Sequence, residues 1–118
     1  MQRDERPIVW IGSSLDDLRR FPDAARARAG YELYRVQRGL APTDRRSMTT
    51  VGRGTREVRI HTDAGGGRVE HRILYVATFE DAVYVLHAFR KTTRKTSRRD
   101  LATARARYRA MLRSRANR

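Results

Sequence analysis

The sequence has no cysteine among its 118 residues, which excludes disulfide bonds, thiolate nucleophiles and zinc–thiolate sites. It has only three histidines, His61, His71 and His87, and no two of them stand at the i, i+4 spacing of a helical metal site. His61 and His71 can face each other across a hairpin, but two ligands do not define a metal site. We therefore expect no metal and no other cofactor.

Long apolar runs are absent too. No stretch of about 18 apolar residues is present, so we expect no segment that crosses a membrane. The first ten residues, MQRDERPIVW, contain no apolar signal core, which predicts a cytoplasmic location. The length matches one domain of ordinary size, and we expect residues 1–118 to form it.

Lysine is the other scarce residue. Lys91 and Lys95 are the only two lysines, both within HAFRKTTRKTS, and the remaining 25 of the 27 basic residues are arginines. An arginine-rich composition can leave two lysines together by chance. The alternative is that this segment needs an ammonium group, a compact charge whose pKa responds to its surroundings.

The formal net charge of +14 on 13.7 kDa, with a pI near 11.5, is the strongest global feature. Such an excess predicts a polyanionic partner: nucleic acid, a ribosome, an anionic membrane surface or an acidic protein. The plain alternative is a solvated basic surface without a partner. Like-charge repulsion on this scale destabilises the folded chain, and a neutralising partner relieves it.

The first third of the chain predicts a short strand and two helices. The apolar run at residues 8–11 ends at a glycine, and Ser13 and Ser14 then precede two aspartates at the spacing of a capping box. From Phe21 to Leu40 the apolar residues recur every three or four positions, which predicts a helix ended by Gly39. The segment LAPTDRRSMTTVGRG is predicted to be a loop.

The pattern then changes to that of strands. TREVRI, HRILYVA and AVYVLHAF are three strand-like runs, and AGGG after Asp63 predicts a hairpin turn between the first two. Ser97, with Asp100 three residues later, predicts the cap of a final helix whose apolar stripe includes Leu101 and Tyr108. The expected order is strand, two helices, three strands and a helix, an α+β fold.

Two groups of residues invite a catalytic interpretation that their context does not support. VGRGT and GGG are glycine-rich, but neither leads into a helix or a Gly-Lys-Ser/Thr sequence, so a phosphate-binding P-loop is excluded. SSLDD combines serines and carboxylates without a nearby histidine, and helix capping explains it. A hydrolytic triad is not predicted.

Cationic side chains on the three predicted strands form the best candidate site. Arg56 and Arg59 lie on the first, Arg72 on the second, and Lys91 and Lys95 just after the third. Adjacent strands lie about 4.8 Å apart, so we expect these groups to converge. Converging cations suit a scissile phosphate, whose negative charge grows in the transition state. For any single arginine, surface charge is the plain alternative.

Aromatic side chains neighbour these cations. Tyr75 and Phe89 lie on the second and third strands, where they can stack on RNA bases. His87 precedes the lysines near the end of a strand. It is either part of the site or a buried histidine bonded to the backbone.

The segments PIVWIGSSLDDLRRFP, AGYELYRVQRGL, VGRGTREVRI, RILYVA and VYVLHAFRKTTRKT resemble the phage-derived branch of the RelE/HigB-like toxins of type II toxin–antitoxin systems. The resemblance covers the chain from about Pro7 to Tyr108. It implies two N-terminal helices and a C-terminal helix packed on a small, mostly antiparallel twisted sheet. It also implies a ribosome-dependent endonuclease that cuts mRNA in the A site, and a cognate helix-turn-helix antitoxin.

The resemblance assigns roles to residues already singled out. The family's Arg-Glu-hydrophobic-Arg strand matches REVR at 56–59, the basic residue of the next strand matches Arg72, and the Phe-x-Lys stretch matches Phe89 and Lys91. Ser97 replaces the proline usual in the family.

In the implied reaction a ribose 2′-OH attacks the adjacent phosphodiester. Arg59 and Arg72 then stabilise the phosphate, Lys91 transfers a proton, and Lys95 contacts the backbone. The expected RNA-binding residues are Arg56, Tyr75, His87, Phe89 and Lys95.

Two other functions remain open from the sequence. One is a binding protein without catalysis, which poisons a topoisomerase or binds RNA. The other is a transcriptional regulator that places the arginine-rich C-terminal helix in a groove of DNA. The apolar stripe of that helix argues instead that it packs on the sheet or on a partner.

Overall fold

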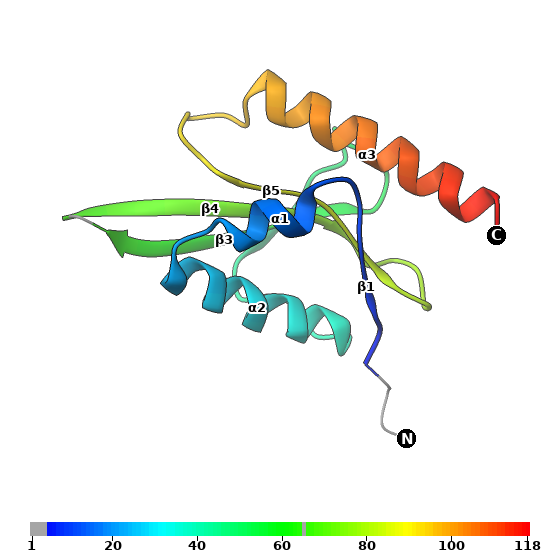
Figure 1. Cartoon of the computed structure of the whole chain (residues 1–118), viewed down its shortest axis with the longest axis horizontal. Coiled ribbons are helices and arrows are strands. Elements are labelled where there is room, and N and C mark those ends of the chain that lie inside the picture. Colours follow the sequence, from blue (N-terminus) through cyan, green and yellow to red (C-terminus); the bar gives the residue numbers. More distant parts are fainter. Residues whose placement is uncertain (1–4, 65) are drawn as a thin grey trace.

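The computed structural model describes residues 5–64 and 66–118. Eight elements follow one another along the chain (Figure 1): β1 (Ile8–Trp10), α1 (Ser14–Arg19), α2 (Asp23–Gln37), β2 (Arg45–Ser47), β3 (Thr55–Ala64), β4 (Gly67–Val76), β5 (Val83–Arg90) and α3 (Arg98–Ala116). The fold is α+β, as the sequence predicts.

The strands form one twisted, open sheet in the order β1-β5-β4-β3-β2. β1 pairs with β5 in parallel, and the other neighbours are antiparallel, so the sheet is mixed. The parallel pair joins the first strand of the chain to the last. This is possible because the helices and the other strands lie between them in the sequence.

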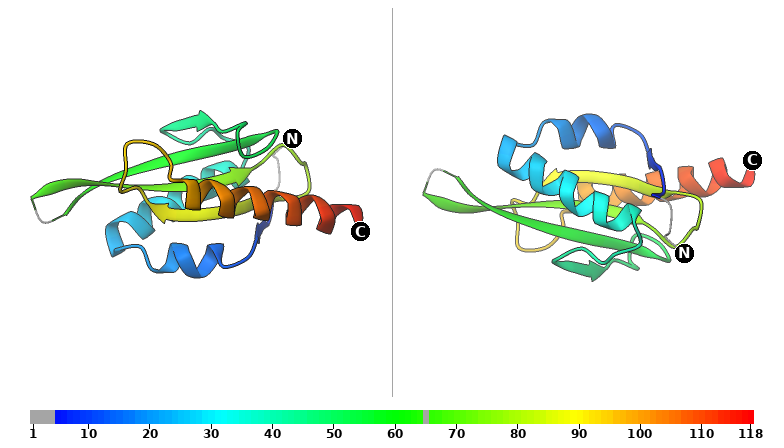
Figure 2. Two further views of the ribbon diagram at one scale, coloured as in Figure 1. Left: turned by 90° about the horizontal axis from the view of Figure 1, so that it is seen from above. Right: turned by 90° about the horizontal axis from the view of Figure 1, so that it is seen from below.

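Helices cover both faces of the sheet (Figure 2). α3 lies across one face, and α1 and α2 lie across the other. Each face has its own apolar cluster. Under α1 and α2 it includes Leu33, Val58 and Ile73, and under α3 it includes Leu74, Leu86 and Met111.

The predicted helix periodicity explains the packing of α2. Ala25, Ala29, Leu33 and Val36 follow one another at steps of four, four and three, and all four are buried. Leu40, expected on the same stripe, is exposed instead. It lies beyond Gly39, whose φ of 80° ends the helix.

Ser97 caps α3 as predicted, because its hydroxyl accepts a hydrogen bond of 3.1 Å from the backbone N–H of Asp100. α1 begins at Ser14 as expected, but without the predicted backbone cap. The Ser13 hydroxyl there donates to the Asp17 carboxylate, at 2.9 Å.

The sheet also differs from the sequence prediction. Residues 45–47 form the edge strand β2 within the predicted loop, and β3 and β4 run four residues further into the hairpin than TREVRI and HRILYVA indicate. The predicted turn AGGG includes Gly65, which lies outside the described residues. His61 pairs in register with Glu70 and His71 with Ile60, so the two histidines do not face each other.

A β-bulge interrupts β5. Tyr75 of β4 pairs with Val85, and the preceding Leu74 pairs with His87, which leaves Leu86 as an extra residue. Val85 belongs to the cluster under α1 and α2, whereas Leu86 packs under α3 and His87 also bonds to α3. The bulge therefore turns two successive side chains to the same face.

Candidate functional site

A cleft of about 340 Å³ opens on the α3 side of the sheet, beside the segment that joins β5 to α3. Its walls come from β2, β4, the β5–α3 segment and the start of α3. Nine residues line it: Arg46, Met48, Thr50, Arg72, Lys91, Arg94, Lys95, Thr96 and Leu101. Five of these nine side chains are cationic, and both lysines of the protein are among them.

Three of the cations in the cleft keep their charge uncompensated. Lys91, Arg94 and Lys95 form no ion pair with any residue of the described part of the chain. The backbone N–H of Lys91 donates to the Glu70 carbonyl at 2.9 Å, which fixes the main chain where the lysine leaves the sheet. The cleft therefore offers positive charge to an anion from outside the protein.

Arg72, by contrast, is bound by two carboxylates. Its Nη1 donates to both carboxylate oxygens of Glu57, at 2.8 and 3.0 Å, and its Nε donates to Glu70 at 2.5 Å. Glu57 is fully buried, and the Arg72 side chain is 5% exposed. These bonds fix the guanidinium in one position at the wall of the cleft.

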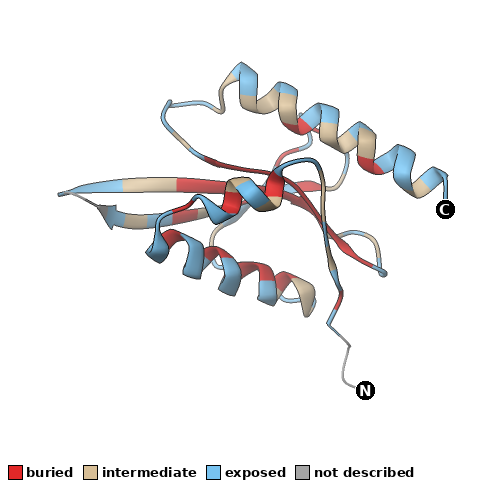
Figure 3. Cartoon of the chain, viewed as in Figure 1, coloured by how far each residue is buried: buried red, intermediate tan, exposed pale blue. Residues whose placement is uncertain are grey.

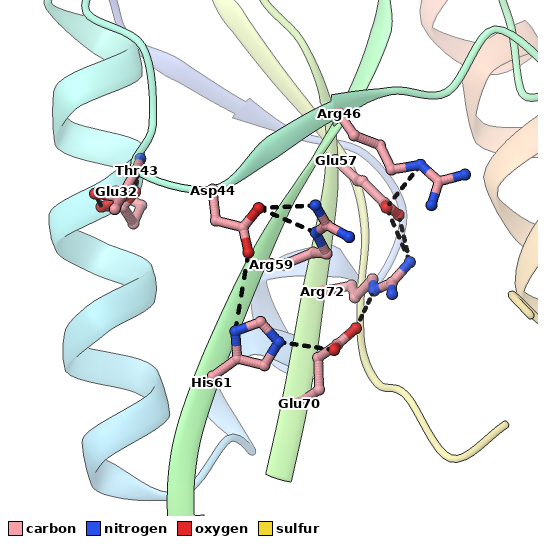
Figure 4. Close-up of polar contacts among 9 residues, drawn as sticks. All are labelled: Glu32, Thr43, Asp44, Arg46, Glu57, Arg59, His61, Glu70 and Arg72. Carbon is pink, nitrogen blue, oxygen red and sulfur yellow. Dashed lines mark hydrogen bonds and ion pairs between the residues drawn. The ribbon is translucent and has the colours of Figure 1, made fainter. Parts of the chain in front are cut away.

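Polar contacts continue on both sides of Arg72 as a chain of seven residues (Figure 4). At one end, Arg46 reaches Glu57 at 3.6 Å and remains 57% exposed. On the other side of Arg72, Glu70 binds His61 at 2.8 Å, and Asp44 lies between His61 at 3.9 Å and Arg59 at 2.9 Å.

The surroundings of Glu70 favour its charged form. Burial alone raises the pKa of this carboxyl, but hydrogen bonds from Arg72 and His61 outweigh burial and bring the pKa below its usual value. Glu70 therefore remains ionised at neutral pH, and Arg72, which two carboxyl groups bind, adds less net charge to the cleft than the lysines do.

Arg59 lies on the same face of the sheet as Arg72 but outside the cleft. It lines a separate hollow with His61 and Arg28, and its guanidinium bonds to Asp44. The expected convergence thus brings together Arg72, Lys91 and Lys95, and places Arg59 next to them.

Arg56 and Tyr75 lie on the opposite face. Both line a hollow beside the end of α2, and Tyr75 packs in the core under α2, with only 2% of its surface exposed. The aromatic ring of Tyr75 therefore has no free face on which a base can stack. Side chains alternate along a strand, so residues 56 and 59 necessarily point to different faces.

His87 and Phe89 lie beneath the start of α3. Their rings stack at 4.8 Å, and His87 Nε2 bonds to the Asp100 carboxylate at 2.7 Å. Both side chains are buried, and neither lines the cleft. His87 is therefore buried, as the structural alternative expects, but its partner is the Asp100 side chain rather than the backbone, and this bond attaches the N-terminal turn of α3 to the sheet.

The sequence did not identify Arg46 and Arg94 as candidates. Arg46 falls in the segment predicted to be a loop, and only its pairing with Glu57 in β2 shows that it faces the cleft. Arg94 lies between the two lysines in the sequence, and this local run of positive charge was the only sequence feature that pointed to it.

The described residues offer no metal site and no membrane span. In residues 5–64 and 66–118, no three histidine, aspartate or glutamate side chains gather in an arrangement that holds a metal ion. No helix of that part combines the length and apolar character needed to cross a bilayer.

Comparison with known proteins finds a family match over the same elements. No curated protein matches the chain. Residues 16–109 match the model of the family described as phage derived protein Gp49-like (DUF891), a stretch that runs from α1 into α3 and includes the whole cleft. The chain therefore belongs to the phage-derived Gp49-like family, a family of toxins from toxin–antitoxin systems within the RelE/HigB-like superfamily.

Proposed function

We propose that this chain is an endoribonuclease toxin that cuts mRNA on the ribosome, in the A site. The observation that supports this most is the cleft, which gathers both lysines and two exposed arginines around the fixed guanidinium of Arg72. A phosphodiester in the cleft meets converging cations, which stabilise the charge that develops in the transition state. The fold that the resemblance implies, that of the RelE-like toxins, agrees with the three helices and the mixed sheet.

The proposed reaction is an internal transfer. The ribose 2′ oxygen attacks phosphorus and loses its proton to water, the O2′–P bond forms, and the bond from phosphorus to the next 5′ oxygen breaks. The products are a 2′,3′-cyclic phosphate and a 5′-hydroxyl end. Lys91 donates the proton to the leaving 5′ oxygen, since no histidine or carboxylate side chain lines the cleft.

The other cations of the cleft contact the phosphates of the RNA. Arg46 and Arg94 contact the non-bridging oxygens, and Lys95 contacts a neighbouring phosphate. Arg72 presents its Nη2 group, which bonds to neither Glu57 nor Glu70. Arg59 does not line the cleft, so it does not contact the phosphate directly. It adds positive electrostatic potential nearby and holds Asp44 in the chain of polar contacts. The ribosome supplies the in-line geometry of the attacking 2′-OH.

The biological setting follows from the family. A toxin of this kind acts in the cytoplasm and is neutralised by a cognate antitoxin, which we propose to be a small helix-turn-helix protein. The +14 charge suits both an RNA target and an acidic antitoxin.

The test is induced expression in a bacterial host, with the 5′ ends of translated mRNAs mapped across the genome. We expect growth arrest with new cuts in translated frames for the parent, and neither for Lys91→Ala. Arg109→Ala, which removes an exposed arginine of α3 far from the cleft lining, serves as the matched control and keeps both effects.

Lys91→Arg separates charge from proton transfer. This variant keeps the positive charge, but a guanidinium does not give up a proton to a leaving group as an ammonium can, so we expect cleavage to fall as in Lys91→Ala. Arrest without any cuts in the parent refutes the nuclease and favours the binding protein without catalysis.

A further inference from the structure

The outer face of α2 exposes two tyrosines among arginines. Tyr31 is 51% exposed and Tyr34 is 45% exposed. Along α2 the buried positions face the sheet and the exposed positions face away from it (Figure 3). Arg28, Arg35 and Arg38 surround them. We call these five residues the Arg–Tyr surface.

The guanidinium groups already lie over the rings. The Cζ atoms of Arg28 and Arg35 are 5.7 and 5.9 Å from the centre of the Tyr31 ring, so this ring has two cationic neighbours. Arg38 lies 5.8 Å from the centre of the Tyr34 ring and donates to its hydroxyl at 3.3 Å. The contacts restrict the arginines, so less conformational entropy is lost when a ligand binds.

The charge of the surface is little compensated. α2 has two carboxylates: Glu32 is 1% exposed and accepts two hydrogen bonds from Thr43, while Asp23 pairs with Arg26 at the first turn. Arg28 approaches Glu32 at 3.7 Å. Arg35 and Arg38 form no ion pair with a described carboxylate.

Exposed aromatic rings in a field of arginines are the chemistry of single-stranded nucleic-acid binding. Bases stack on aromatic faces and on guanidinium planes, while the arginines neutralise phosphates. An acidic protein also satisfies the charge, but it gives the rings no flat π partner. The pairing of rings with guanidinium planes therefore favours unpaired RNA.

We propose that the Arg–Tyr surface is a second RNA-binding site, which stacks unpaired nucleotides on Tyr31 and Tyr34. It rests on the proposed function only in that RNA is the target. α2 and α3 lie on opposite faces of the sheet (Figure 2), and the cleft is on the α3 side, so the two sites do not engage one short strand. If RNA binds on both faces of the sheet, the protein must be surrounded by a folded RNA. A single unfolded mRNA strand could not reach both sites at once.

The test measures the binding of an unstructured oligoribonucleotide of about ten nucleotides by fluorescence anisotropy. The parent protein is compared with Tyr31→Ala/Tyr34→Ala and with Tyr31→Phe/Tyr34→Phe, each in the Lys91→Ala background, which weakens the cleft. Loss of two stacked bases predicts at least roughly thirtyfold weaker binding by the alanine variant, and the phenylalanine variant retains parental affinity. Leu112→Ala, which removes an exposed apolar side chain from α3, is the control and leaves affinity unchanged.

The salt dependence gives an independent measurement. Arg35→Gln/Arg38→Gln lowers the slope of log affinity against log salt by about 0.7 for each lost phosphate contact, whereas the tyrosine variants keep the parental slope. Affinity within twofold of the parent for the alanine variant overturns the proposal. The proposal is also overturned if the alanine variant keeps its RNA affinity but no longer binds a glutamate-rich helical peptide. That result would assign the surface to an acidic protein. These results do not depend on mRNA cleavage, so the two proposals fail separately.

Discussion

Glu57 and Arg72 form a buried ion pair between adjacent strands, with both oxygens of the carboxylate within 3.0 Å of one guanidinium nitrogen. Removing one charge leaves the other buried and only partly compensated, since Glu70 and Arg46 remain nearby. We expect Glu57→Gln to lower the free energy of unfolding by roughly 3 kcal/mol, measured by urea denaturation.

The double variant Glu57→Met/Arg72→Met removes both charges, and we expect it to recover most of the stability that Glu57→Gln loses. Equal urea midpoints for Glu57→Gln and the parent would show that the pair does not act as a unit.

Arg45 and Arg46 are neighbours in β2 with different surroundings. Arg46 lines the cleft, whereas Arg45 points to the other face, beside Arg56 and Tyr75. We expect Arg46→Gln to reduce mRNA cleavage by on the order of tenfold to a hundredfold, because one cation leaves the transition state. Arg45→Gln removes the same charge and leaves cleavage within about twofold of the parent. Equal losses would instead indicate that only net charge matters.

His71 makes stability depend on pH. Burial, assisted by the nearby Arg90, holds the pKa of this imidazole below its ordinary value. The unfolded chain then binds a proton more readily than the folded one, so stability is complete above the ordinary histidine pKa and falls as the pH drops through it. We expect His71→Phe to reduce the loss of melting temperature between about pH 8 and about pH 5.5.

The same substitution removes a buried polar atom. His71 Nδ1 has no hydrogen-bond partner in the described part of the chain, and the ring packs on Phe21 at 4.3 Å. His71→Phe is therefore neutral or stabilising at high pH. The carboxyls with lowered pKa values, Glu70 and Asp81, lose their contribution only at more acidic pH, outside this window. An unchanged pH profile would contradict the assignment.

Replacing each of two glycines by alanine is expected to change the free energy of unfolding in opposite directions. A Cβ at Gly52 would lie 2.5 Å from the Tyr108 ring, whose hydroxyl donates to the Arg53 carbonyl at 2.7 Å. We expect Gly52→Ala to cost about 1–3 kcal/mol by overpacking. Gly30 lies inside α2 with nothing within 4 Å of the added carbon, so Gly30→Ala stabilises by about 1 kcal/mol. Thermal unfolding of both variants checks the signs.

The sequence predicted the helices better than the sheet. The apolar stripe of α2 and the Ser97 cap depend on neighbours within a few residues, so local spacing is enough to recognise them. β2 is three residues long and lacks an apolar residue, and only its pairing with β3 defines it as a strand. No local pattern contains that information.

The candidate site was predicted in part for a related reason. Lys91, Lys95 and Arg72 converge as expected, but Tyr75 lies on the other face of the sheet. Alternation shows which residues of one strand share a face, but it does not show which face of the sheet α3 covers. The structural role of His87 depends on Asp100, a contact across 13 positions that spacing does not reveal.

The bulge in β5 decides which cation reaches the cleft. With strict alternation from Tyr84, a residue on the α3 face, positions 86, 88 and 90 would share that face and Lys91 would point toward α2. Because the bulge turns Leu86 and His87 to the same face, the alternation shifts by one position, so Lys91 lines the cleft and Arg90 does not. The choice of ammonium over guanidinium is thus made by the bulge, since a regular β5 strand of the same sequence would present Arg90 to the cleft in place of Lys91.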